Sequence, residues 1–253
     1  MPKLLKAIIT TVLLVANSSV NAAQEDIDAE VAEYSRIFSS DNFQQQRRAI
    51  DRLFWAGYNS TAFYDAIAEQ LDIVKERTDK VSKERAAWYA KALALSGSEN
   101  YRALLEGVAS DASAKKVRKY ATQALERLNV HQSWNPIISQ NLQDAPVGRL
   151  EEARVKNMLS ANDHALLRIG AKRVYHGHKS DAELIAHAKQ RLASEYKLVV
   201  NGNDEQIDAI AWLIKVMAES GDRKNLALLE EISANSKVKK VKRYALKYTE
   251  YLK

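Results

Sequence analysis

Three histidines, His176, His178 and His187, form the pattern closest to a metal site. Imidazole nitrogens are common metal ligands, but two side chains that are two residues apart do not share one face of a helix. Gly177 fits a helix end, and no Asp or Glu stands at ligand spacing on the turn expected to face these histidines. We therefore predict no metal site and assign no cofactor.

The sequence also lacks the common catalytic motifs. It contains no G-x-S-x-G, no P-loop, no H-E-x-x-H and no glycine-rich dinucleotide fingerprint. It has no cysteine, which excludes disulfides, thiolate metal sites and thiol catalysis. Acidic pairs such as Glu151 and Glu152 fall on faces expected to be solvated. We predict no catalytic residue, and an enzyme of the helical-repeat type stays open as a weaker alternative.

The chemically most distinctive segment is KVKKVKRYALKY, residues 237–248, in which six of twelve residues are Lys or Arg. Apolar residues recur at spacings of three and four from Val238 to Leu252, which predicts an amphipathic helix with one apolar stripe. The cationic side chains lie off that stripe or at its border. They form either an ordinary solvated face or a surface that contacts an acidic partner.

The basic segment has an earlier counterpart, because residues 87–128 align with residues 211–252 at an offset of 124 without a gap. Trp88 then matches Trp212, and Tyr120 matches Tyr244. Farther upstream the offset is 120, which places a four-residue insertion near residues 200–203. We interpret the chain as two tandem copies of one unit of roughly 120 residues.

The elements that carry these residues are predicted to be helices throughout. Helical spacing dominates, only 8 Gly and 3 Pro interrupt it, and N-cap residue types precede most of the apolar runs. Between the copies, Pro136 and Pro146 argue against a continuous helix, so 129–146 is predicted to be a connecting segment packed along its neighbours. The predicted helices are 26–39, 42–56, 60–73, 81–95, 98–110, 113–128, 147–160, 162–176, 180–195, 204–219, 222–233 and 237–252.

The first 22 residues have the pattern of a secretory signal peptide. Lys3 and Lys6 precede an apolar run at 7–16, and Val20-Asn21-Ala22 is a small-residue cleavage signal. The apolar run is about half the length that a membrane-spanning helix needs, and no later segment reaches that length. We expect cleavage near Ala22, a mature chain without a transmembrane segment, and export to the periplasm or beyond.

Several predicted helices resemble the HEAT repeat signature, in which Asp or Asn precedes a V-R pair, small residues and a Leu. The best match is SDASAKKVRKYATQAL at 110–125, followed by segments at 234–248, 40–57 and 161–174. The resemblance implies an all-α superhelix, a HEAT-like solenoid of about six helix pairs, with halves at 23–128 and 147–253. The first-helix proline of many HEAT repeats is absent, and Lys242 replaces the Arg of the signature.

The resemblance also implies roles for individual residues. In similar repeats the Arg of the V-R pair bonds an acidic residue of an adjoining turn, and the second helix of each pair lines the concave side. The implied structural ladder consists of Arg48, Arg118 and Arg168 with Asp41, Asp111 and Asp163. The implied partner-binding residues are Arg52, Lys115, Lys119, Lys172, Lys239, Lys240 and Arg243. We predict that Trp88 and Trp212 pack in the core.

These observations favour an exported scaffold or adaptor that binds another protein through its concave surface. Residues 147–253 carry 20 Lys plus Arg against 14 Asp plus Glu, a balance of +6. A binder of anionic envelope components, such as lipid headgroups, lipopolysaccharide or cell-wall polymer, is therefore the first alternative. Nucleic acid is an improbable partner because the leader directs the chain out of the cytoplasm.

Overall fold

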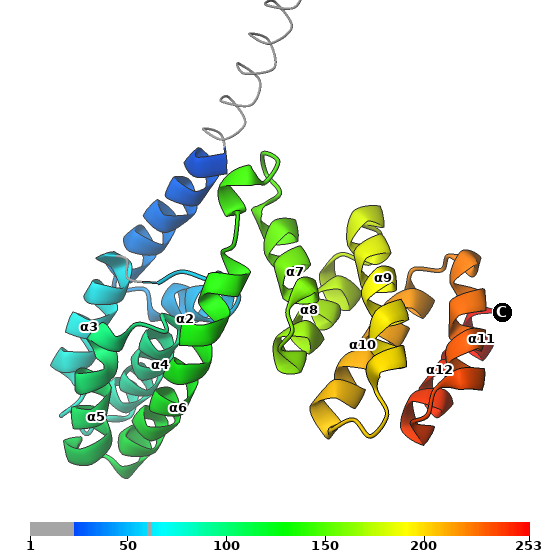
Figure 1. Cartoon of the computed structure of the whole chain (residues 1–253). Coiled ribbons are helices and arrows are strands. Elements are labelled where there is room, and N and C mark those ends of the chain that lie inside the picture. Colours follow the sequence, from blue (N-terminus) through cyan, green and yellow to red (C-terminus); the bar gives the residue numbers. More distant parts are fainter. Residues whose placement is uncertain (1–22, 60–61) are drawn as a thin grey trace, which may run out of the picture. The chain divides into compact units, whose positions relative to one another are not determined.

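The computed structural model describes residues 23–59 and 62–253, and the described part is all-α, without a strand (Figure 1). The predicted signal peptide, residues 1–22, lies outside the described residues. The chain divides into two compact units, one ending at Arg154 and the other comprising Val155–Lys253. Within the described residues no helix is both long enough and apolar enough to cross a membrane.

The helix bounds follow the predicted pattern closely, with consecutive helices packed on one another. Predicted N-caps are present, since Asn42, Asp163, Asp181 and Asn203 each accept a hydrogen bond from the first turn of the helix that follows. The first unit contains a helix over 23–38, α2 (Phe43–Leu53), α3 (Ala62–Val74), α4 (Lys80–Leu95), η1 (Glu99–Tyr101), α5 (Arg102–Asp111), α6 (Lys115–Ile138) and η2 (Leu142–Asp144). The chain continues with α7 (Leu150–Ser160), α8 (His164–Gly177), α9 (Ala182–Leu198), α10 (Asp204–Glu219), η3 (Arg223–Asn225), α11 (Leu226–Asn235) and α12 (Lys239–Leu252).

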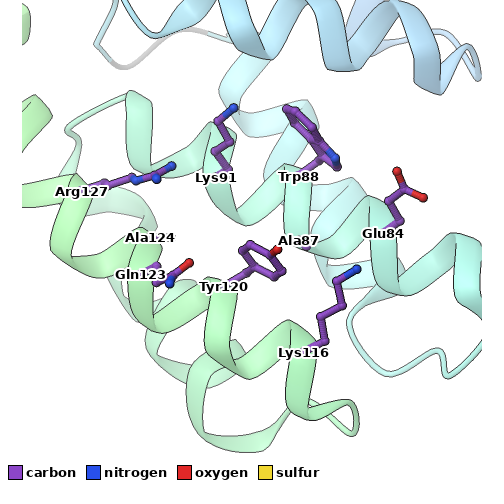
Figure 2. A pocket seen from close by; sticks show the side chains of 9 residues that line it. All are labelled: Glu84, Ala87, Trp88, Lys91, Lys116, Tyr120, Gln123, Ala124 and Arg127. Carbon is purple, nitrogen blue, oxygen red and sulfur yellow. The ribbon is translucent and has the colours of Figure 1, made fainter.

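One helix in each unit occupies the middle of the packing. In the first unit α4 contacts α2, α3 and α6, and Figure 2 shows α4 and α6 next to each other. In the second unit α10 contacts α8, α9 and α12. Helix α5 packs on α6 in the first unit, and α11 packs on α12 in the second. Each unit is therefore built around a row of three helices, α2, α4 and α6 or α8, α10 and α12.

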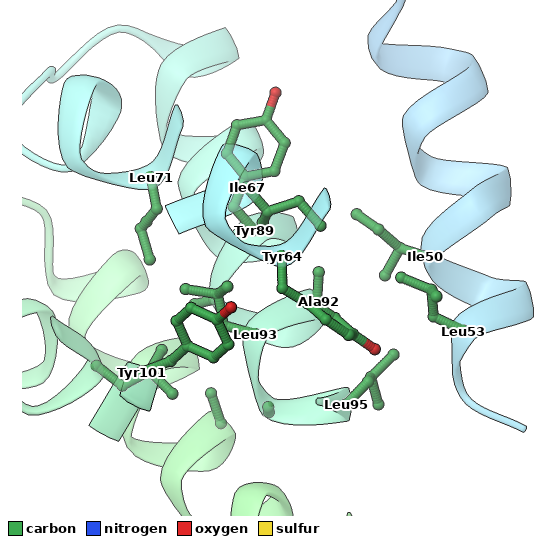
Figure 3. Packing of buried hydrophobic residues seen from close by; sticks show 14 of the residues in the cluster. Ile50, Leu53, Tyr64, Ile67, Leu71, Tyr89, Ala92, Leu93, Leu95 and Tyr101 are labelled. Atoms are coloured by element: carbon green, nitrogen blue, oxygen red, sulfur yellow. The ribbon is translucent and has the colours of Figure 1, made fainter. Parts of the chain in front are cut away.

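Helix α4 is suited to the middle position because its sequence is apolar on most sides. Its last turns, from Tyr89 to Leu95, are buried except for Lys91. Figure 3 shows how Ile50 and Leu53 of α2 and Tyr64, Ile67 and Leu71 of α3 pack around these turns. Alanines in α4 let the neighbouring backbones approach, while larger side chains of the neighbours fill the remaining space.

The long helix α6 differs from the sequence prediction. The connecting segment was predicted to start at residue 129, but α6 continues to Ile138 with Pro136 inside it. Proline removes one backbone donor, and this cost is offset because the last turns of α6 bury Trp134, Asn135 and Ile138. The predicted packing of this segment along its neighbours is present, and it takes the form of a helix.

The C-terminal end of α4 is held by the last turns of α6. The Asn135 side-chain amide donates to the carbonyl oxygens of Leu95 and Ser96, both at 2.9 Å, and of Tyr58 at 3.2 Å. Gly97 follows at φ +61°, and a Cβ there would lie 2.5 Å from backbone atoms of His131. Only glycine allows the backbones of α4 and α6 to come this close. The glycine that predicts the end of α4 in the sequence is therefore also the residue that the packing requires there.

His131, one turn before Asn135, is buried in the same contact. Its Nδ1 lies 3.2 Å from Asn135 Oδ1, and its ring meets the edges of Phe54 and Trp134. Burial lowers the pKa of His131 from 6.5 to about 4. The folded state therefore holds the imidazole neutral at pH values where the unfolded chain protonates it.

A buried ion pair joins Arg154 of α7 to the helix at 23–38. The Arg154 side chain, 4% exposed, donates to Glu30 Oε2 at 2.8 Å and to the Tyr58 hydroxyl at 2.9 Å. The Tyr58 hydroxyl in turn donates to Glu30 at 2.9 Å. Burial raises the pKa of Tyr58, so this hydroxyl keeps its proton and acts as a donor.

Replacing Asn135 with alanine should lower the free energy of unfolding by about 1 to 3 kcal/mol, because buried carbonyl groups at the end of α4 lose their donor. Urea denaturation followed by circular dichroism measures this change. Ser133→Ala is the matched control, since Ser133 is exposed on the same helix. Equal losses in the two variants would contradict the assigned role of Asn135.

The stability contributed by neutral His131 is fully present above pH 6.5 and is lost as the pH falls toward 4, because the unfolded chain gains a proton first. Between pH 7 and pH 5 the wild-type chain should lose about 2 kcal/mol more unfolding free energy than His131→Gln. Denaturation series at both pH values test this difference. Parallel pH dependence in the two proteins would refute it.

Candidate functional site

The row α2, α4 and α6 presents a tryptophan flanked by two cations. The Arg47 guanidinium lies 4.8 Å and the Lys91 ammonium 4.3 Å from the Trp88 ring centroid. Each cation also has a carboxylate partner, since Arg47 pairs with Glu84 at 3.1 Å and Lys91 with Asp51 at 2.8 Å. Trp88 packs against the core, as predicted, and is only partly buried there, so its ring can also contact the two cations.

Beside Trp88 lies an open pocket of about 440 Å³ between α4 and α6 (Figure 2). Figure 2 shows the rings of Trp88 and Tyr120 within the group of lining side chains. Tyr120 is 40% exposed, so its ring is available to a ligand in the pocket. The pocket is lined by Glu84, Ala87, Trp88, Lys91, Lys116, Tyr120, Gln123, Ala124 and Arg127.

The charges around this pocket are predominantly positive. Lys91, Lys116 and Arg127 line it together with the single carboxylate of Glu84, and Glu84 is already paired with Arg47. Lys116 also lies 5.9 Å from the Tyr120 ring centroid. The volume is within the range of ligand pockets, and the lining suits an acidic group attached to an apolar or aromatic side chain.

The row α8, α10 and α12 carries a related arrangement around Trp212. The Lys215 ammonium lies 3.7 Å and the Lys172 ammonium 5.0 Å from the ring centroid, and the Tyr175 ring meets Trp212 edge-on at 5.5 Å. Burial lowers the pKa of Lys215, and the neighbouring Lys172 and Lys247 lower it further. Like Trp88, Trp212 is partly buried and holds cations at its faces.

The residues predicted to bind a partner lie on these helices, but none of them lines the Trp88 pocket. Lys115 and Lys119 are exposed on α6, and Lys239 and Arg243 are exposed on α12. Arg52 pairs with Glu33 at 2.8 Å. Lys240 lies 3.5 Å from Asp208 and 3.7 Å from Asp204, and Lys172 belongs to the Trp212 arrangement.

The pocket residues that sequence reasoning missed are neighbours of those it selected. Lys116 and Tyr120 follow Lys115 and Lys119 by one position, which is about 100° around a helix. The available signal was the matched pair of aromatic residues Trp88 and Tyr120, which recurs at the offset of 124 as Trp212 and Tyr244.

The arginines predicted to form a ladder have other partners. Arg118 donates to the carbonyl oxygens of Ala112 and Ser113, the first residues after α5, and Arg168 lies 3.8 Å from Asp208 on α10. Arg118 thus bonds the carbonyl groups at the end of α5, and Arg168 faces the neighbouring helix. Asp163 caps α8, accepting from the Leu166 amide at 2.9 Å.

The remaining members of the predicted ladder lie at the surface. Arg48 and Asp111 are exposed, and the Asp41 carbonyl oxygen accepts from Arg85 at 3.4 Å. The ladder that the resemblance implies therefore stays a prediction, with Arg168 the member that has an acidic residue of a neighbouring helix within 3.8 Å.

The histidines of the sequence analysis serve separate contacts. His176 packs against the rings of Tyr175 and Trp212, His178 caps α8, and His187 Nε2 lies 2.8 Å from Ser160 Oγ. The described part of the chain has no group of three or more His, Cys, Asp or Glu side chains that could hold a metal ion.

Ser160 and His187 resemble a nucleophile and its base, and they line a small open pocket of about 230 Å³. However, Ser160 Oγ also lies 2.9 Å from the Lys156 carbonyl oxygen of its own helix. The Ser160 hydroxyl proton can therefore be donated to the backbone of its own helix instead of to His187, and we assign the pair no catalytic step.

Comparisons of this chain with protein-family models, with curated proteins and with solved structures each returned no match. The fold defines an all-α protein of packed consecutive helices, consistent with a helical-repeat protein. Its candidate site is the Trp88 pocket, with the Trp212 arrangement as a related feature in the second unit.

Because its pKa is lowered, Lys215 should be acetylated faster by dilute acetic anhydride near pH 8 than the exposed Lys237, since only the neutral amine reacts. Lys172→Met removes one like charge and should slow the labelling of Lys215. Lys237→Met is the control. Site-resolved mass spectrometry reads both rates, and an unchanged Lys215 rate in Lys172→Met would contradict the coupling.

Proposed function

We propose that this chain is an exported binding scaffold that holds an acidic segment of a partner protein at the Trp88 pocket. The observation that carries the proposal is the combination of two partly exposed aromatic rings with an excess of cations in one pocket of about 440 Å³. Export rests on the leader pattern of residues 1–22, which the sequence supplies.

The pocket has the composition of a protein-binding hot spot. Trp, Tyr and Arg dominate the binding energy of most interfaces because they bury a large area and still form polar contacts. An apolar or aromatic side chain of the partner would lie against Trp88 and Tyr120. Carboxylates on either side of it would pair with Lys116 and Arg127, which have no internal ion pair within the described residues.

We also propose that the two units are copies of one HEAT-like repeat unit. Helices α4, α5 and α6 begin at Lys80, Arg102 and Lys115, and α10, α11 and α12 begin at Asp204, Leu226 and Lys239, each exactly matched at the offset of 124. The preceding glycines Gly97 and Gly221 also share a positive φ. These equivalences support a duplicated HEAT-like unit, in which the second helices form the binding face.

The alternative of an anionic envelope ligand is favoured by the basic balance of residues 147–253. Salt dependence separates it from protein binding, because contacts that rest mainly on exposed charges weaken steeply between low and physiological salt. A contact anchored by Trp88 and Tyr120 retains its apolar part under the same conditions.

The test compares two neighbouring charge reversals on α6. Lys116→Glu alters the pocket, whereas Lys115→Glu makes the same change at an exposed position outside it. After affinity capture from extracts of the source organism identifies a partner, Lys116→Glu and Tyr120→Ala should each weaken its binding by roughly tenfold or more. Lys115→Glu should bind like the wild-type chain, and all variants should keep the wild-type helix content.

Two results would overturn the proposal. One is a partner that binds Lys116→Glu and Tyr120→Ala as tightly as it binds the wild-type chain. The other is the absence of any specifically captured protein when the mature chain is folded, as judged by circular dichroism.

A further inference from the structure

The two tryptophan arrangements differ in one respect that the repeat does not explain. In the first unit Lys91, one turn after Trp88, bonds Asp51 of the adjacent helix α2 at 2.8 Å. In the second unit Lys215, one turn after Trp212, faces Lys172 of the adjacent helix α8, and both cations contact the same ring. The neighbouring helix supplies a carboxylate in one unit and an ammonium group in the other.

A third cation, Lys247 of α12, completes the group. Lys172 and Lys215 both contact the Trp212 ring, and Lys247 lies within electrostatic range of Lys215; we call Lys172, Lys215 and Lys247 the lysine cluster. Within the described residues none of the three takes part in an ion pair with a carboxylate. Asp208, the carboxylate that acts on Lys215, is shared by Lys240 at 3.5 Å and Arg168 at 3.8 Å.

Aromatic rings hold this concentration of positive charge in place. Trp212 contacts two of the ammonium groups, and Lys247 lies 5.5 Å from the Tyr248 ring centroid. Each such contact is favourable and offsets part of the repulsion between like charges. The ammonium donors themselves are left without an anionic acceptor.

We propose that the lysine cluster is a binding site for a phosphate group. Three ammonium groups offer more positive charge than one carboxylate can balance. A phosphate monoester carries about −1.5 to −2 charges at pH 7 and three strong acceptor oxygens, so it can accept from the ammonium groups at Trp212 while the charge of Lys247 adds to the attraction. Lysine ammonium groups are common phosphate ligands in proteins.

The same chemistry could come from a soluble phosphate or from the headgroup of a phospholipid. The first experiment uses inorganic phosphate and measures its dissociation constant for the wild-type mature chain by isothermal titration calorimetry, with sodium chloride holding the ionic strength constant. The second uses cosedimentation with vesicles of phosphatidylcholine alone or with part of it replaced by phosphatidylglycerol.

Lys215→Met and Lys172→Asp test the site, and Lys237→Met controls for the loss of an exposed lysine elsewhere in the same unit. Either site variant should weaken the binding of phosphate or of anionic vesicles by roughly tenfold or more, while the control binds like the wild-type chain. Lys172→Asp supplies a carboxylate from the adjacent helix, as Asp51 does for Lys91 in the first unit. It should melt no lower than the wild-type chain, and this melting measurement separates a loss of binding from unfolding.

Binding of inorganic phosphate that the site variants lose supports a soluble ligand. Binding of phosphatidylglycerol vesicles alone, lost in the same variants, supports a lipid headgroup. The proposal is overturned if neither probe binds, or if both site variants bind them as tightly as the wild-type chain. It does not depend on the Trp88 pocket, and Lys116→Glu should leave the binding of either probe unchanged.

Discussion

The burial of a middle helix on most of its sides is the constraint on which both units depend. A helix pair of some thirty residues cannot cover the apolar faces of both its members, so each pair needs a neighbour. Helices α4 and α10 satisfy this need from two directions, contacting α2 and α6 or α8 and α12 within their rows and α3 or α9 behind them. Their alanine-rich sequences allow close approach, and their larger side chains complete the core.

This packing leaves only a narrow strip of each middle helix in contact with solvent. Trp88 with Lys91, and Trp212 with Lys215, occupy that strip one helical turn apart. Side chains there are held by a rigid core on one side, which lowers the entropy cost of binding on the other. The exposed strip of each middle helix thus carries aromatic rings and cations, which are the residue types that bind acidic groups well.

Much of this architecture follows from local signals in the sequence. Helical periodicity, capping residues such as Asn42 and Asp181, and glycines such as Gly97 located the helices and most of their ends. The continuation of α6 through Pro136 could not be predicted locally, because the compensation comes from Asn135 and Trp134 packing against a distant part of the chain.

The candidate sites were harder to predict because they depend on which helix lies opposite. The sequence identified the basic helices, but the choice between Lys115 and Lys116 depends on a rotation of about 100° that only the packing of α6 on α4 fixes. The partner of Arg168 depends on packing in the same way, since Asp208 lies on the facing helix α10. The adjacent helix likewise decides that Lys91 pairs with the carboxylate of Asp51 whereas Lys215 faces the ammonium group of Lys172.

The ion pair between Glu30 and Arg154 joins residues that are 124 positions apart. A ribosome makes the carboxylate early and its cation only after almost the whole first unit has been synthesised. A nascent or truncated chain that stops short of α7 therefore leaves Glu30 and the Tyr58 hydroxyl without their guanidinium. The helix at 23–38 therefore packs on α2 and α3 before it gains this ion pair.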